Sequence, residues 1–141
     1  MHLGGALVSR NSLLTALAGV LGAATRTNQA RQTGALIYAF DHEGVLVYAQ
    51  ASGGADSIVL DCDASGGIHG TTSAFAGTLA IDGQAISPDT DPQTLTAIKQ
   101  LGLSHPGSHS GVWGGHYNSL ELVFAYLKST RRLSLIEIDF K

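Results

Sequence analysis

Short apolar runs with helical spacing alternate with longer runs of strand-forming residues. One helix is predicted over residues 14–22 and a second over residues 95–102, because their leucines and isoleucines return every three or four positions. Asp91-Pro92 has the composition of a helix start, and a glycine ends each apolar run at residue 22 and residue 102. The other apolar segments alternate with polar residues, as strands of an antiparallel sheet do.

The order of these predicted elements repeats along the chain. LTALAGVLG at 14–22 resembles LTAIKQLG at 95–102, and the segment 46–63 aligns with 122–139 without a gap. The alignment places eight residues on equivalent faces: Leu46 and Tyr48 with Leu122 and Phe124, and Leu60 and Cys62 with Ile136 and Ile138. We therefore predict a single domain over 1–141 built of two repeats, about 1–66 and 73–141.

Each repeat is expected to run strand, helix and three strands. The predicted fold is α+β, with tandem duplicated β-α-β-β-β units forming an antiparallel sheet that carries two short helices on one face. The opposite sheet face is then free to act as a binding platform or as a solvated surface.

Acidic residues dominate the middle of the chain. No Lys or Arg occurs between Arg31 and Lys99, whereas eight acids do: Asp41, Glu43, Asp56, Asp61, Asp63, Asp82, Asp89 and Asp91. Such a field repels nucleic acid and attracts a basic partner, although the same acids are also typical of turns and solvated faces. The chain as a whole has a net charge of −3, with 44% hydrophobic and 13% charged residues, which is the composition of a globular protein.

The apolar stretch SLLTALAGVLGAA at 12–24 resembles the core of a secretory signal. Its counterpart in the second repeat indicates instead that it belongs to the fold. We therefore expect a cytoplasmic protein without a membrane segment.

Few residues carry the patterns of catalysis. Cys62 stands between two aspartates, which would raise the pKa of its thiol, and its repeat position is apolar, so a core cysteine is expected. Asp61, Asp63, Glu137 and Asp139 could hold a cation, but the spacing of a calcium loop is absent and a solvated strand face is favoured. Because no nucleophile elbow, P-loop, HExxH or dinucleotide motif occurs, we predict no enzyme activity and no cofactor.

The segment LSHPGSHSGVWGGHYN at 103–118 is richest in histidine and glycine. His105 and His109 are four residues apart, but Pro106 and Gly107 exclude the helix that would bring them together on zinc. The first repeat makes the equivalent connection without histidine, so the metal site is disfavoured and a recognition loop is favoured. Partner-binding candidates are Trp113, His116 and Tyr117 here, with Tyr126 as a further aromatic, and Asp41, His42, Glu43 and Asp61 in the first repeat.

Four stretches occur in a fixed order: GALVSRNSLLTALAGVLGAATR, YAFDHEGVLVYA, FAGTLAIDGQAISPDT and SLELVFAYLKSTRRLSLIEID. With the aromatic-acid-glycine hairpin at 40–44 and the F-x-G-x-L-x-I-x-G strand at 75–83, this order resembles an uncharacterised bacterial family encoded near interbacterial toxins, such as type VI secretion effectors. The tandem plan is also similar to that of beta-lactamase inhibitory protein, which binds its enzyme across an open sheet. The resemblance implies an immunity protein acting on a toxin in the cytosol.

The leading hypothesis is therefore a non-catalytic inhibitor that neutralises a cognate toxin by protein–protein contact. The acidic middle favours a basic toxin, such as a nuclease. Two alternatives stay open: an envelope or assembly-factor binding module, and a metal or enzymatic protein that uses the loop from His105 to His116.

Overall fold

The computed structural model describes residues 1–30, 33–64, 70–104 and 111–141. Its elements, in chain order, are β1 (His2–Leu3), β2 (Ala6–Leu7), α1 (Leu13–Leu21), β3 (Arg26–Gln29), β4 (Leu36–Phe40), β5 (Val45–Ala49), β6 (Ala55–Asp61), β7 (Leu79–Ile81), β8 (Gln84–Ile86), α2 (Pro92–Thr96), the 3₁₀ helix η1 (Lys99–Leu101), β9 (Val112–Tyr117), β10 (Leu120–Tyr126) and β11 (Leu133–Phe140).

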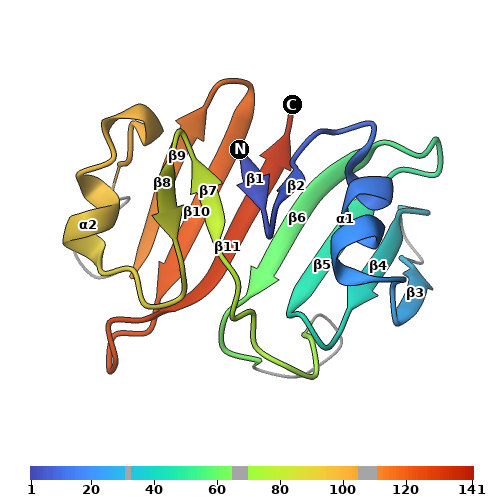
Figure 1. Cartoon of the computed structure of the whole chain (residues 1–141), viewed down its shortest axis with the longest axis horizontal. Helices are drawn as coiled ribbons and strands as arrows, with labels where there is room; N and C mark the ends of the chain where they lie inside the picture. Colours follow the sequence, from blue (N-terminus) through green and yellow to red (C-terminus); the bar gives the residue numbers. More distant parts are fainter. Residues whose placement is uncertain (31–32, 65–69, 105–110) are drawn as a thin grey trace.

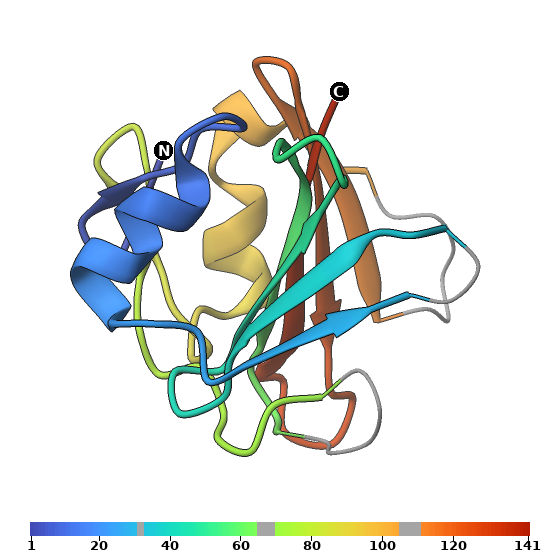
Figure 2. The same cartoon turned by 90° about the vertical axis from the view of Figure 1, so that its right-hand side faces the viewer.

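The strands form two antiparallel sheets. The large sheet has seven strands in the order β3-β4-β5-β6-β11-β10-β9, and the small sheet has four in the order β2-β1-β7-β8. The small sheet and both α-helices lie on one side of the large sheet, with the helices flanking the small sheet (Figures 1 and 2). The predicted α+β class, with two short helices on one face, is confirmed.

The main core fills the space between the two layers. Its buried side chains come from both sheets and both helices, and the largest include Leu3, Leu17, Leu60, Leu79 and Phe124. Leu17 of α1 and Leu95 of α2 point into this core, which gives each short helix its apolar stripe. No described helix has the length and apolar character needed to cross a membrane.

The second helix is shorter than its apolar spacing predicts. Asp91 caps α2 as expected, but α2 ends at Thr96, and η1 forms a separate turn that stops before the left-handed Gly102. The helical pattern is interrupted at Ile98, whose backbone leaves helical geometry at ψ 89° while its side chain is buried in the core. Ile98 is apolar because it is buried in the core, so its position in the sequence imitates the spacing of one continuous helix.

The two halves have matching orders of elements, with differences from the predicted unit. Each half begins with a two-stranded hairpin rather than one strand, and the first half contains an additional edge strand, β3. The halves meet at the middle of both sheets, where Leu3 pairs with Leu79 and Leu60 pairs with Ile136. These two pairs have the same separation in sequence, which fits the predicted duplication; the duplication itself remains a prediction.

One part of the predicted alignment is wrong. Leu46 and Tyr48 of β5 belong to a cluster on the far side of the large sheet, whereas Leu122 and Phe124 of β10 face the main core. Val45 and Val47 are the core-facing residues of β5, although both hairpins have a register irregularity, at Tyr48/Ala49 and at Ala125/Tyr126. Leu60 pairs with Val45, whereas its counterpart Ile136 pairs with Phe124, so the gapless alignment is displaced by three residues here, and an odd displacement in a strand reverses the face of every side chain.

Candidate functional site

The open face is the side of the large sheet that turns away from the helices. At its centre Ala39, Leu46 and Val59 are buried, and Ile37, Tyr48 and Leu135 pack around them while remaining partly exposed. We call these six residues the apolar patch. It is a second apolar cluster, separate from the main core, and its partly exposed members face outward.

Carboxylates continue this face beyond the apolar patch. Glu137 and Asp139 follow Leu135 at alternate positions of β11, so all three side chains point the same way. Asp139 pairs across to Glu121 of β10, and Glu121 pairs across to the exposed His116 of β9. A row of acids therefore borders the patch on one side.

Two of these acids have no cation beside them among the described residues. Glu121 forms an ion pair with Lys141, but no described Lys or Arg forms one with Glu137 or Asp139. Burial raises the pKa of Glu137, and the neighbouring Asp139 raises it further. Burial and Glu121 likewise raise the pKa of Asp139, so a cation from outside would stabilise both charges.

Asp41 is bound within the fold. Arg26 donates from Nε to Oδ2 at 2.8 Å and from Nη2 to Oδ1 at 3.0 Å, and Thr25 Oγ1 donates to Oδ2 at 2.7 Å. Arg26 also donates to the Gly70 carbonyl at 2.7 Å. The hydrogen bond from Arg26 holds the pKa of Asp41 below its usual value. This carboxylate ties β3 to the segment that begins at residue 70.

Asp61 is bound in a similar way. Its Oδ2 accepts hydrogen bonds from the Thr71 backbone N–H at 3.0 Å and from Thr71 Oγ1 at 3.1 Å, and both residues are buried. Asp41 follows β4 and Asp61 ends β6, and both accept hydrogen bonds from residues 71–73. Their geometry gives them a structural role, whereas they were predicted as contacts for a partner.

The aromatic candidates lie on the other side of the sheet. Trp113, Tyr117 and Tyr126 are partly buried and pack against the main core. Tyr117 donates its hydroxyl to Asp82 in the β7–β8 turn, and Tyr126 donates to the Thr90 carbonyl at 2.8 Å. These two hydroxyl groups connect the large sheet to the layer that contains the small sheet and α2. Of the three candidates from segment 103–118, only His116 points to the open face.

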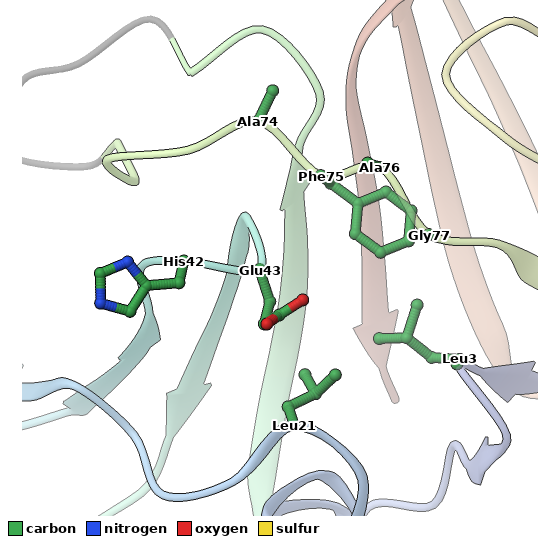
Figure 3. A pocket seen from close by; sticks show the side chains of 9 residues that line it. Leu3, Leu21, His42, Glu43, Ala74, Phe75, Ala76 and Gly77 are labelled. Atoms are coloured by element: carbon green, nitrogen blue, oxygen red, sulfur yellow. The ribbon is translucent and has the colours of Figure 1, made fainter.

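His42 and Glu43 are exposed in the turn between β4 and β5, beside a cavity of about 250 Å³. Leu3, Leu21 and Phe75 form its apolar walls, and Figure 3 shows the Glu43 carboxylate between them while the His42 ring points away. The structure thus places the predicted site residues in four separate locations rather than in one cluster.

The disfavoured metal and thiol alternatives find no site among the described residues. His105 and His109 lie outside the described residues, and within residues 1–30, 33–64, 70–104 and 111–141 no group of three His, Cys, Asp or Glu could hold a metal ion. Cys62 is buried, and burial raises the pKa of its thiol to about 12. A thiol that stays protonated at neutral pH is a poor nucleophile.

Sequence reasoning identified only part of the open face. The alternation of Glu137 and Asp139 with Ile136 and Ile138 shows that both acids point away from the core. The contribution of β5 was missed, because the displaced alignment placed Leu46 and Tyr48 on the same face as Leu122 and Phe124.

Comparisons of this chain with protein-family models, curated proteins and solved structures gave no match. Its function therefore has to be argued from the geometry and charge of the described residues.

Proposed function

We propose that this chain is a non-catalytic inhibitor that binds a basic protein partner across the open face of its large sheet. The observation that carries the proposal is the apolar patch bordered by Glu137 and Asp139, two carboxylates with no described cationic neighbour. In this proposal the partner is a cognate bacterial toxin, and contact with the open face blocks or distorts its active site.

The shape of the site favours a protein over a small molecule. Ile37, Tyr48 and Leu135 come from three different strands and form a broad surface on a sheet. Small-molecule sites, by contrast, are concave and enclose most of their ligand. An apolar centre beside charged groups is the arrangement of a protein interface, in which a few central residues supply most of the binding energy. Tyr48 is the strongest candidate for such a residue.

The negative charge of the open face favours a basic partner. Two carboxylates whose ionisation is disfavoured in the free protein gain most from a Lys or Arg brought by another molecule. The long acidic stretch between Arg31 and Lys99 adds a field that steers a basic protein toward the molecule. A nuclease toxin, which needs positive charge to hold its substrate, fits this requirement.

The test uses the product of the gene adjacent to this one. The two proteins are mixed, and their affinity and the protection of cells from the toxin are measured. A stable complex is expected, and Asp139→Asn should weaken it by at least about tenfold, the effect of removing one partner of a desolvated charge pair. Asp89→Asn is the matched control, because it removes the same charge from an exposed residue paired with Arg132 on another part of the surface.

Three results would contradict the proposal: no complex, a complex without protection, or equal weakening by the two variants. Fractionation of cells tests the proposed cytoplasmic location separately. Recovery of the protein from the envelope, with residues 1–24 removed, would favour the alternative of an envelope or assembly module.

A further inference from the structure

The cavity beside Glu43 lies on the helix side of the large sheet, next to the turn at residues 41–44. We call this cavity of about 250 Å³ the turn pocket. Its walls come from β1, the last residue of α1 and the segment 74–77, and its one carboxylate belongs to Glu43 (Figure 3). The function proposed for the open face does not use this pocket.

The turn pocket is formed in the free protein. Gly44 has a positive φ of 68°, and a Cβ at this position would lie 2.1 Å from the backbone nitrogen of Phe75, so the turn and the segment 74–77 are in direct contact. The Phe75 N–H donates to the Asp61 carbonyl at 2.7 Å. A Cβ on Gly77 would lie 2.8 Å from the Phe75 ring, which shows that the ring rests against this glycine. The aromatic wall is therefore held from two sides.

The charge of the turn pocket is as distinctive as its shape. Glu43 is exposed, and its carboxylate points toward Leu3, Leu21 and Phe75 rather than away from the molecule (Figure 3). No described Lys or Arg forms an ion pair with it. An apolar recess with one unpaired carboxylate at its opening complements a ligand that has an aliphatic stem and a cationic end.

We infer that the turn pocket binds one lysine or arginine side chain of a protein partner. The methylene stem would pack on Leu21, Ala74 and Ala76, the lining side chains that keep exposed surface, and the cationic group would pair with Glu43. The partner is the basic protein of the proposed function, but the chemistry of the pocket can be tested without it.

The test is a titration of the isotope-labelled protein with Nα-acetyl-lysine methylamide, followed by two-dimensional NMR. Amide shifts are expected at Glu43, Phe75 and Gly77, with a dissociation constant of about 1–10 mM, as befits a ligand of this size. The norleucine analogue, which keeps the stem and lacks the charge, should bind at least about threefold more weakly. The arginine analogue distinguishes the two cations.

Two variants assign the effect to one group. Glu43→Gln should weaken lysine binding to the level of norleucine, whereas Asp89→Asn, which removes an exposed carboxylate outside the turn pocket, should leave it unchanged. Both positions are exposed, so a urea unfolding curve confirms that the variants fold. Absence of shifts at the pocket, equal binding of lysine and norleucine, or no effect of Glu43→Gln would overturn the inference. None of these results bears on the open face, whose test uses Asp139.

Discussion

The absence of a side chain at Gly44 is required for the contact between the turn at residues 41–44 and the Phe75 backbone. Gly44→Ala would place a methyl group against the Phe75 backbone and also force a residue with a Cβ into positive φ. We expect a loss of about 2–5 kcal/mol in the free energy of unfolding, measured with urea. Gly83→Ala is the control, because Gly83 has a φ of 79° with nothing near its Cβ position and should cost about 1–2 kcal/mol. Equal losses would show that the contact with Phe75 is unimportant.

Cys62 should be inert in the folded protein. Its thiol is buried, and its pKa is raised to about 12 from 9.0, so the reactive thiolate is almost absent at pH 8. Iodoacetamide is expected to modify Cys62 only after unfolding in urea, as mass spectrometry would show. Because the pKa is raised in the folded state, the contribution of this thiol to stability is complete below pH 9.0 and is lost as the pH rises toward 12. Rapid labelling of the native protein would contradict this assignment.

Carboxylates of similar sequence context have different roles in this fold. Asp41 and Asp61 accept hydrogen bonds from Arg26 and Thr71, residues that are 15 and 10 positions away in the chain. Glu137 and Asp139 meet no such donor among the described residues. The sequence shows that all four are acids near strands, but only the tertiary structure decides which of them find a partner. Predictions of acidic contact sites from sequence are therefore least secure where chain segments cross.

At the scale of elements, the two helix starts differ in a way that can be measured. Asp91 accepts hydrogen bonds from the backbone N–H groups of Gln93 and Thr94, whereas the Ser12 side chain makes no capping hydrogen bond at the start of α1. Asp91→Ala should therefore lower the Tm by a few degrees, a shift typical of a lost N-cap. Ser12→Ala should leave the Tm within error. A thermal scan followed by circular dichroism compares the two, and similar shifts would argue against this difference in capping.

The elements were predictable where one local signal determines them. The Asp91-Pro92 start and the alternation in β11 both correspond to structure. The side that β5 presents to the core was not predictable, because it depends on which residues of β5 and β6 pair across the hairpin, and no composition marks that register. The β1–β2 hairpin was also missed, since strands of two residues are stabilised by their neighbours rather than by their own pattern.

At the scale of the whole molecule, the open face should carry a cost in stability. When folding raises the pKa of a carboxyl group, that group stabilises the fold at a pH below its unfolded pKa. This stabilisation is lost as the pH rises through the pKa of the folded state. Glu137 and Asp139, whose carboxyl pKa values are raised from the ordinary 4.5 and 3.8, therefore destabilise the free protein at pH 7. Glu137→Gln should raise the free energy of unfolding at pH 7 by up to about 1 kcal/mol, allowing for solvent screening.

The same variant should show little difference from the parent protein near pH 4, where the carboxyl of Glu137 is already protonated. Urea unfolding at the two pH values provides the comparison. A variant that is less stable at pH 7 would show that Glu137 has a cationic partner within the chain. A variant that is more stable yet binds the basic partner less well would mean that the acid is kept for binding at the expense of stability.

The central place of β11 in the large sheet also affects how the protein is made. This strand is the last described one to be synthesised, yet it lies between β6 and β10 and joins the two halves. Until Leu133–Phe140 has left the ribosome, β6 and β10 each have a free hydrogen-bonding edge, and such edges are sites of aggregation. The nascent chain therefore passes through a long interval with its largest sheet open. Slow emergence of these final residues, or their loss by truncation, should yield aggregated chains rather than a functional half.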